Sequence, residues 1–348
     1  MKEAMPKSGK KTARKYLVNV GLLFCTLFIF LLLVLAADLL AHAKFLNMAG
    51  LNYKGYRGLV VKKKQNNEIR LVMMGGSTVF GYGVKYNETV PARLEVELQK
   101  VLSASGAGKK ATVVNLGYNS EGAYAFFYNL KDFSYLGYDY VIIYDGYNDL
   151  GVGNATVYRH SNPIFRIFGY MPTLPLVMKE KIMLMKNGGN LEDAYRGKKI
   201  VFEPTKKDII KIAVLNSALE VYNNTENIMN RLNKVKDSDF DKEELKRDNW
   251  AWYKHYMKKS IDYALAQNKK VIVITQPYLS DSHVEQQHAL REMLVSNYGD
   301  DKNVSYINLG DAISVKDKEL VYDGVHLSIR GCQIMAASIA EKIGDKLN

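Results

Sequence analysis

The chain is poor in cysteine and has no cysteine cluster. Only two cysteines occur among its 348 residues, Cys25 inside a long apolar run and Cys332 near the C-terminus, so a bridge between them is not expected. The absence of a Cys-x-x-Cys pair or a Cys/His cluster argues against a structural zinc site. A domain of this size does not need disulfides for stability, so their scarcity does not exclude an exported location.

The sequence also lacks the patterns of a nucleic-acid-binding protein, although its formal net charge is +12. Six basic side chains gather in residues 1–15 against one glutamate, and the others are spread over lysine-rich stretches such as Lys62-Lys63-Lys64. No recognition-helix pattern or zinc-finger spacing accompanies them. The basic excess therefore predicts a solvated surface that favours anionic membranes or polyanionic substrates, with no nucleic-acid partner.

Among the apolar runs, the one near the N-terminus is long enough to cross a membrane. Residues 17–37, "LVNVGLLFCTLFIFLLLVLAA", carry no charge over 21 positions. As a helix this run would be about 31 Å long, close to the thickness of one hydrocarbon core. With the basic residues before it, the positive-inside rule predicts a cytoplasmic tail over 1–16, a signal-anchor helix over 17–40 and an extracytoplasmic remainder.

A cleaved signal peptide is the alternative for this segment. Ala41-His42-Ala43 resembles a small-x-small cleavage site. The apolar run is longer than the roughly 7–15 residues usual in signal peptides, and Asp38 interrupts the approach to the site, so an uncleaved anchor is favoured. Both interpretations export the rest of the chain, in which residues 41–69 form a juxtamembrane connector.

Beyond residue 69, short β-rich apolar runs alternate with helical patterns. This alternation predicts an α/β domain over residues 70–348 with a flavodoxin-like, three-layer architecture, a parallel sheet covered by helices on both faces. The active groups of such a fold lie at the carboxyl ends of its strands. The expected strands are 70–74, 111–116, 140–144, 270–275 and 304–309, and the expected helices are 91–102, 123–133, 241–267, 282–297 and 328–346.

Residues 151–240 interrupt the alternation and are expected to form a helical insertion. The stretch "HSNPIFRIFGYMPTLPLVMKEKIMLMK" mixes aromatic, Met and Pro residues without a strand period, and a long helical pattern follows around 207–235. An ordinary insertion that packs its apolar side on the core is favoured. A lid over a site and a membrane-apposed surface are the alternatives.

The first expected strand ends in "LVMMGGSTVFGYG", residues 71–83, which delivers Ser77 among glycines. One interpretation is a turn with a serine that caps the next helix. The other is a nucleophile, which needs a base and an orienting partner for that base. Of the six histidines, His326 stands in "VYDGVHLSIRG", three residues after Asp323, where the turn can place a carboxylate beside the imidazole.

Two further loops follow strands in the same manner. "VVNLGYNSEG" offers Gly117, whose backbone N–H can approach a ligand, and "VIIYDGYNDL" offers the Asn148 side-chain amide. Such groups are the donors that stabilise a tetrahedral oxyanion. Taken singly, each glycine and asparagine is equally explained by turn conformation.

Together, Ser77, Gly117, Asn148 and the Asp323/His326 pair occur in an order that resembles the SGNH (GDSL-type) hydrolase family. The resemblance covers about residues 70–150 and 268–346. It implies that Ser77 is the nucleophile, His326 the base and Asp323 its partner. It also implies an oxyanion hole made by Ser77, Gly117 and Asn148, and no metal or other cofactor.

Two positions depart from the family pattern. Gly76 stands where the family name implies Asp, which leaves the nucleophile in place, and Gly117 and Gly122 are five apart where a spacing of three is usual. The second departure concerns the geometry of the loop. Residues near the motifs that could shape a pocket are Tyr82, Asn119 and Tyr147, with Asp145 and Asp149 close by; each is also explained by a structural role.

The favoured function is that of a membrane-anchored serine esterase that acts on acyl esters outside the cytoplasm through an acyl-enzyme. O-acyl groups on a glycan fit the outward-facing location best, and a lipid ester is an alternative. An O-acyltransferase for an exported polysaccharide would use the same residues. A non-catalytic anchored scaffold that binds glycans or anionic lipids is the third hypothesis.

Overall fold

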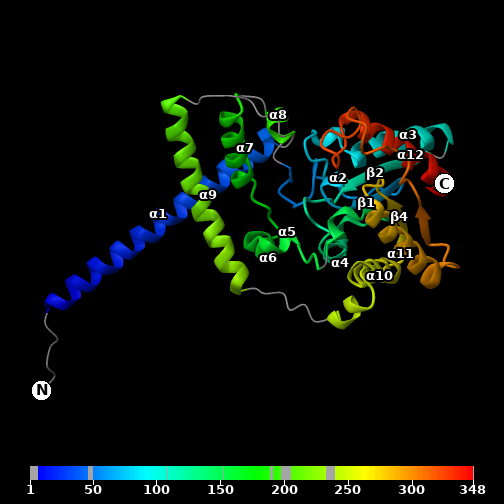
Figure 1. Cartoon of the computed structure of the whole chain (residues 1–348). Helices are drawn as coiled ribbons and strands as arrows, with labels where there is room; N and C mark the ends of the chain where they lie inside the picture. Colours follow the sequence, from blue (N-terminus) through cyan, green and yellow to red (C-terminus); the bar gives the residue numbers. More distant parts are fainter. Residues whose placement is uncertain are drawn as a thin grey trace, which may run out of the picture.

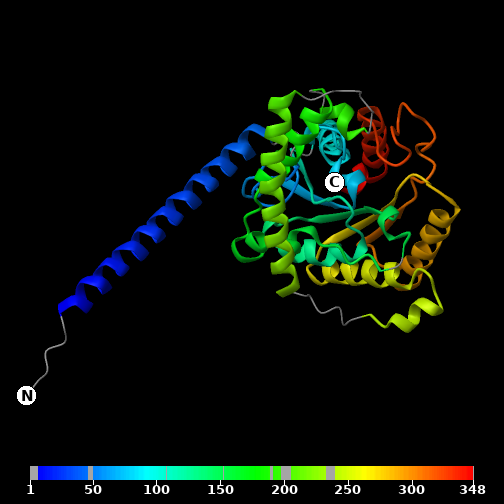
Figure 2. The ribbon, with the colours of Figure 1, turned by 60° about the vertical axis from the view of Figure 1, so that its left-hand side comes forward.

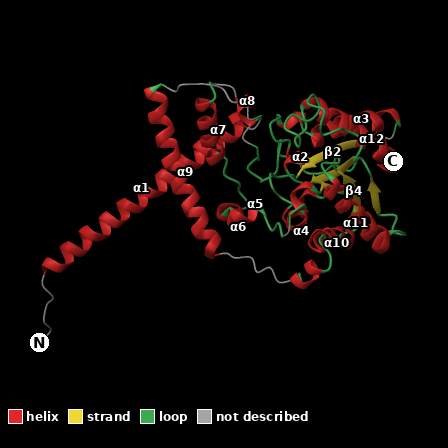
Figure 3. Ribbon diagram, in the orientation of Figure 1, coloured by secondary structure: helices red, strands yellow, loops and turns green. Residues whose placement is uncertain are grey.

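The computed structural model describes residues 7–45, 50–106, 108–151, 153–188, 191–196, 205–232 and 240–347. Its centre is a five-stranded, wholly parallel sheet with the order β2-β1-β3-β4-β5 (Figures 1 and 3). This is the flavodoxin-like order, and the predicted α/β class is confirmed. The strands are β1 (Glu68–Met74), β2 (Lys110–Asn115), β3 (Tyr140–Asp145), β4 (Lys270–Thr275) and β5 (Val304–Ile307).

Helices cover both faces of the sheet, as predicted. On one face α3 (Val90–Ala104) packs against α12 (Ile329–Ile343), and on the other α4 (Ala123–Asp132) packs against α10 (Ala251–Ala266), next to α11 (Asp281–Tyr298). β3 is buried along its whole length because it lies between these two layers. Its side chains therefore divide between two cores, with Val141 and Ile143 in one and Ile142 and Tyr144 in the other.

Two expected helices are shorter in the structure. The expected helix 241–267 is broken: a 3₁₀ turn, η4 (Lys242–Lys246), precedes α10, and the Asp248 carboxylate accepts a hydrogen bond from the Trp250 backbone N–H at the break. Such a local side-chain bond competes with continuation of the helix. The last expected helix, 328–346, begins after Ser328, whose hydroxyl caps it, and ends as a 3₁₀ turn, η5 (Gly344–Leu347).

The insertion is helical in its described residues and lies to one side of the sheet (Figures 1 and 2). The helices are α5 (Tyr158–Ser161), α6 (Pro163–Phe168), α7 (Leu174–Lys186), α8 (Leu191–Tyr195) and α9 (Lys206–Leu232). The last three residues of the helix expected around 207–235 fall outside the described residues. The main partner of α9 is α7, which also contacts α8.

The N-terminal helix α1 (Lys7–Phe45) projects away from the domain (Figures 1 and 2). Within it, the span Arg14–Ala43 contains an 18-residue window with a mean hydropathy of 2.9, so this helix is long and apolar enough to cross a membrane. Its C-terminal end is held by the insertion: the buried Asp38 accepts hydrogen bonds from the backbone N–H groups of Thr173 and Leu174, at the start of α7. His42 is buried beside them, 2.9 Å from the Met171 carbonyl oxygen.

Candidate active site

The position of Ser77 follows from the two glycines that precede it. After β1 ends at Met74, Gly75 comes so close to β3 that a Cβ there would lie 2.2 Å from the Tyr144 carbonyl oxygen. The short helix α2 (Ser77–Phe80) then starts at Ser77 and buries Thr78, Val79 and Phe80. The chain therefore leaves the sheet through a gap that only glycine fits, and Ser77 lies at the carboxyl end of a central strand.

Ser77, His326 and Asp323 form a continuous hydrogen-bonded chain. Ser77 Oγ lies 2.8 Å from His326 Nε2, and His326 Nδ1 lies 2.6 Å from Asp323 Oδ2. The other Asp323 oxygen accepts the backbone N–H groups of His326 at 2.7 Å and Val325 at 3.0 Å. The structure thus brings together three residues that the sequence places up to 249 positions apart.

The Asp323 carboxylate is held ionised by its partners. Burial alone would raise the pKa of this carboxyl, but hydrogen bonds from the His326 side chain and backbone outweigh burial and lower the pKa below its usual value. A carboxylate fixed on Nδ1 keeps the proton of the neutral imidazole on that nitrogen, so Nε2 can accept the Ser77 proton. The arrangement can therefore convert a serine hydroxyl into a nucleophile.

The Asn148 amide lies directly beside the nucleophile loop. Asn148 belongs to the 3₁₀ turn η3 (Tyr147–Asp149) that follows β3, and its Nδ2 donates to the Glu121 carbonyl oxygen at 2.8 Å. A Cβ on Gly76 would lie 1.9 Å from this Nδ2. The close approach of the amide to the backbone of the nucleophile loop therefore requires glycine at position 76, which gives a physical reason for the departure from the family's Asp.

The Gly117 backbone N–H is engaged within its own loop. It donates to Asn115 Oδ1 at 3.0 Å, while Asn115 Nδ2 donates to the Val79 carbonyl oxygen at 2.7 Å. A Cβ on Gly117 would lie 2.6 Å from the Phe80 backbone nitrogen, so packing against α2 accounts for glycine here. The structure thus uses this donor differently from the oxyanion role expected from the sequence.

Ser120, in the same loop, is a residue that the sequence analysis missed. Its φ of +62° is left-handed, which is uncommon for a residue with a side chain. The loop is held on both sides of Ser120: the Tyr118 backbone N–H donates to the Gly75 carbonyl oxygen of the nucleophile loop at 3.1 Å, and the Glu121 carbonyl oxygen accepts the Asn148 amide of η3. Among the described atoms, the Ser120 backbone N–H donates to no protein acceptor.

Gln276 joins two of the site loops and was also missed. Its side chain is 1% exposed, and its Nε2 donates to Thr78 Oγ1 at 2.6 Å while its Oε1 accepts the Tyr147 backbone N–H at 3.0 Å. Thr78 follows Ser77, and Tyr147 precedes Asn148. A single residue after β4 therefore fixes the nucleophile loop and the Asn148 turn relative to each other.

A buried ion pair connects the site to the insertion. Arg159 of α5 lies 3.2 Å from Glu121 Oε2, and both side chains are fully buried. Glu121 Oε1 accepts the Tyr158 backbone N–H at 3.0 Å, and Asn129 hydrogen-bonds both members of the pair. Because the Glu121 carbonyl also holds Asn148, this residue links the start of the insertion to the site.

The three predicted pocket residues have different surroundings. The Tyr82 ring lies 4.9 Å from the His326 ring, and Tyr195 of α8 packs edge-on against Tyr82 at 5.1 Å, so the insertion contributes to the wall beside the base. Tyr147 instead turns its hydroxyl to the Pro277 carbonyl oxygen at 2.5 Å. Asn119 buries its side-chain oxygen without a protein partner among the described residues.

Asp145 and Asp149 form a buried acidic pair behind the Asn148 turn. They are 2% and 3% exposed, and Asp149 Oδ2 accepts the Ala123 backbone N–H at 2.9 Å. Burial raises the pKa of both carboxyls, and the neighbouring Asp149 carboxylate raises that of Asp145 further. Two interacting carboxylates in a buried site do not both ionise, so the pair retains a proton.

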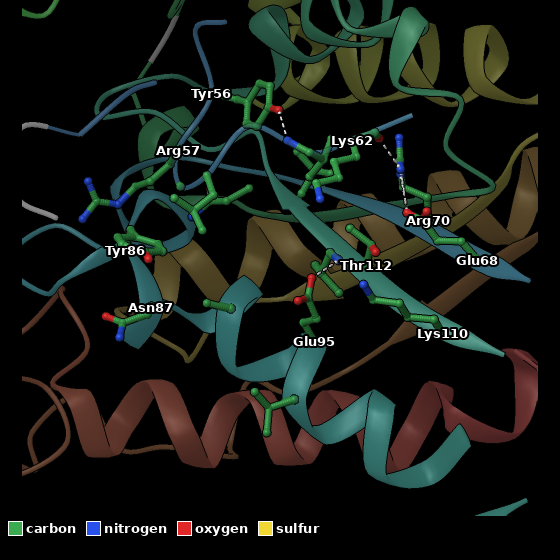
Figure 4. Close-up of a pocket in the computed structure, with 18 of the residues that line it drawn as sticks. Tyr56, Arg57, Lys62, Glu68, Arg70, Tyr86, Asn87, Glu95, Lys110 and Thr112 are labelled. Atoms are coloured by element: carbon green, nitrogen blue, oxygen red, sulfur yellow. Dashed lines mark hydrogen bonds and ion pairs between the residues drawn. The ribbon is translucent and has the colours of Figure 1, made fainter. Parts of the chain in front are cut away.

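The described residues contain no group of three or more His, Cys, Asp and Glu side chains that could hold a metal ion. A cavity of about 610 Å³ lies elsewhere, at the outer edge of the sheet between β2, α3 and residues 56–70 (Figure 4). There Glu95 Oε2 accepts the Val113 backbone N–H at 2.8 Å, which pairs part of the open strand edge. The lining of this cavity does not include Ser77, Asn148 or His326.

Comparison with known proteins gives structural neighbours only. No protein-family model and no curated protein matches the sequence. Similar solved structures include a lipase/acylhydrolase from Enterococcus faecalis, at 16% identity, with 80% of this chain and 96% of that chain covered and a TM-score of 0.42. A family 3 carbohydrate esterase from Clostridium thermocellum has 12% identity, 80% and 98% coverage and a TM-score of 0.42.

A third similar structure is a GDSL-like lipase from Bacteroides thetaiotaomicron VPI-5482, at 12% identity, with 83% of this chain and 93% of that chain covered and a TM-score of 0.39. All three TM-scores lie below 0.5. The assignment of a function to this chain therefore depends on its own strand order and on the geometry of Ser77, His326 and Asp323.

Proposed function

We propose that the protein is a serine ester hydrolase of the SGNH type that works through an acyl-enzyme. The observation that carries this proposal is the hydrogen-bonded chain from Ser77 Oγ through the His326 imidazole to Asp323. A serine hydroxyl becomes nucleophilic when a base removes its proton, and the base needs a partner that fixes its tautomer. All three parts lie at the same end of the sheet.

In the first half of the reaction, Ser77 Oγ attacks the carbonyl carbon of the ester and its proton passes to His326 Nε2. Asp323 stabilises the imidazolium that forms. When the tetrahedral intermediate collapses, the alcohol leaves with the proton from Nε2 and the acyl group stays on Ser77. In the second half, water gives its proton to His326, attacks the acyl carbon and releases the acid, and Ser77 regains its proton.

The negative charge of the tetrahedral intermediate needs preorganised donors. We assign this role to the Ser77 backbone N–H, at the start of α2, and to Asn148 Nδ2 beside Gly76. Since Gly117 already donates to Asn115, the third donor in this proposal is the backbone N–H of Ser120, which has a left-handed conformation. The proposal therefore keeps two of the three expected donors and replaces one.

The location of the catalytic domain relative to the membrane favours one class of substrate. We propose that α1 crosses the membrane with its N-terminus in the cytoplasm, and that the catalytic domain faces outward. The contacts of Asp38 and His42 with the insertion support retention of α1, because cleavage after Ala43 would remove both residues from a buried site. A tethered, outward-facing esterase fits O-acyl groups on a glycan best.

Transfer of the acyl group to a sugar hydroxyl is the second candidate. It would use the same residues, with the sugar hydroxyl in place of water in the second half of the reaction. The specific observation that favours it is the contact of Tyr195 with Tyr82, since an aromatic wall beside His326 narrows the access of water to the base.

The experiment is labelling of the full chain in detergent with a fluorophosphonate probe, together with hydrolysis of p-nitrophenyl acetate. Labelling and turnover are expected for the parent protein and for Ser103→Ala, an exposed serine on α3, and both are lost in Ser77→Ala. A folded parent protein without labelling contradicts the proposal. Products from an O-acetylated glycan, with and without an acceptor glycan, then separate hydrolysis from transfer.

A further inference from the structure

Helix α9 has one covered face and one uncovered apolar face. Ile212, Leu215 and Leu219 are partly buried, at the spacing of one helical stripe, and α7 is the main partner of the helix. On the opposite side, Ile210, Val214 and Val221 recur four and seven residues apart and are 66%, 64% and 68% exposed. A helix with an apolar stripe on its open side needs a further apolar environment.

The short helix α6 extends this surface. It contacts α9, and its Ile167 and Phe168 are 67% and 76% exposed. We use the name apolar foot for the five side chains Ile167, Phe168, Ile210, Val214 and Val221. Exposed Lys206 and Lys207 on the first turn of α9, and Lys211 one turn on, border the stripe, as on helices that lie at a membrane surface.

Contacts between the anchor helix α1 and α7 determine the position of the apolar foot relative to α1. Asp38 accepts the backbone N–H groups of Thr173 and of Leu174, the first residue of α7. Ala41 packs on Val177 of α7, and α7 also contacts α9. In both views, α9 runs crosswise to α1 and lies on the side of the sheet from which α1 leaves (Figures 1 and 2). A helix crosswise to a membrane-spanning helix lies roughly along the plane of that membrane.

We infer that the apolar foot lies in the interfacial region of the bilayer that α1 crosses, with its lysines toward anionic headgroups. The outer leaflet is the surface that covers these side chains, because α9 packs on α7 and α7 is bound to the C-terminal end of α1. Burial by about 5–10 Å is typical of such helices, and each lysine near an anionic surface adds attraction. This inference goes beyond the proposed chemistry and needs only that α1 spans the membrane.

The test places an environment-sensitive NBD fluorophore on the full chain in liposomes that contain phosphatidylcholine and phosphatidylglycerol. Val214→Cys is labelled in a Cys25→Ala background, in which the remaining Cys332 is buried. The matched control is Val295→Cys on α11, because Val295 is also 64% exposed. Brominated lipids quench a label in the bilayer, and aqueous iodide quenches a label in water.

The expected result is strong quenching by brominated lipid and weak quenching by iodide at position 214, and the reverse at position 295. Iodide quenching equal at both positions overturns the inference. Protection of position 214 from both quenchers also overturns it, because a second copy or another protein would then cover the foot. A label on native Cys25 reports separately whether α1 is in the bilayer, and labelling of Ser77 by fluorophosphonate reports separately on the proposed function.

Discussion

The sheet domain and the insertion are stabilised by different kinds of contact. The sheet buries continuous apolar strands between two layers of helices, and its polar residues emerge where the strands end. The insertion packs a few apolar side chains on the core, such as Val157 and Met171, and is also attached through two buried polar contacts, Asp38 with the start of α7 and Glu121 with Arg159. It leaves large apolar side chains exposed on α6 and α9. The first pattern builds a rigid catalytic frame, while the second fixes the orientation of an attached element.

The largest effect is expected from the catalytic frame itself. His326→Ala removes the base and should lower kcat by about 10⁴-fold or more, and Asp323→Asn should cost less because the base remains. Steady-state hydrolysis of p-nitrophenyl acetate measures both. Near-normal turnover in His326→Ala would show that His326 is not the base.

Replacing Arg159, one partner of the buried ion pair with Glu121, tests how strongly this pair attaches the insertion. Arg159→Met leaves the Glu121 charge buried without its partner and should lower the free energy of unfolding by about 3–5 kcal/mol. The matched control is Arg330→Met, which breaks the pair with Glu319 on the surface, where the two side chains are 66% and 76% exposed, and should cost about 0–1 kcal/mol. Equal shifts of the two unfolding midpoints would show that the buried ion pair contributes no more to stability than the exposed one.

An oxyanion donor should matter less than the base. Asn148→Ala is expected to lower kcat by about 10²-fold, or about 3 kcal/mol, with little change in KM, because the amide acts on charge that develops in the transition state. Asn297→Ala, on the outer helix α11, serves as the control. A rise in KM at constant kcat would instead assign Asn148 to substrate binding.

The acidic pair behind Asn148 predicts a pH-dependent stability. Because burial raises the pKa of Asp145, the folded protein binds a proton that the unfolded chain releases above its ordinary Asp pKa, and stability falls as the pH rises through that window. Asp145→Asn removes this proton uptake, so the difference between its unfolding midpoint and that of the parent protein should grow in favour of the variant as the pH rises above the ordinary pKa of Asp. The slope is at most about 1.4 kcal/mol per pH unit. A constant difference between the two proteins would show that Asp145 does not titrate in this way.

The smallest effect is expected where the insertion meets the site. Tyr195→Ala removes the ring that packs on Tyr82, an aromatic contact worth about 0.5–1.5 kcal/mol. KM for an acylated glycan should rise several-fold, while turnover of p-nitrophenyl acetate stays the same. Tyr195→Phe keeps the ring and should restore the KM. An equal loss with both substrates would place Tyr195 in the chemical step.

Local signals account for what could be predicted. The five strands are apolar runs that end at polar or glycine residues, so their positions were predicted to within a few residues. Asp323 and His326 are three residues apart in one turn, so their contact needs little tertiary information. Gln276 and Glu121 gave no such signal, because a glutamine after a strand and a glutamate in a loop are ordinary by themselves.

The sequence by itself determined the α/β class, the apolar N-terminal helix and the residue types that could perform ester chemistry, because these depend on composition and on spacing over a few residues. The tertiary structure alone decided that the Gly117 N–H binds Asn115, that Gly76 admits the Asn148 amide, and that Asp38 holds the insertion to the anchor. The first contact lies within one loop that packs against α2, and the other two join residues on separate elements. Their geometry depends on which strands are neighbours in the sheet and on how closely backbones approach, and neither is encoded in a local pattern.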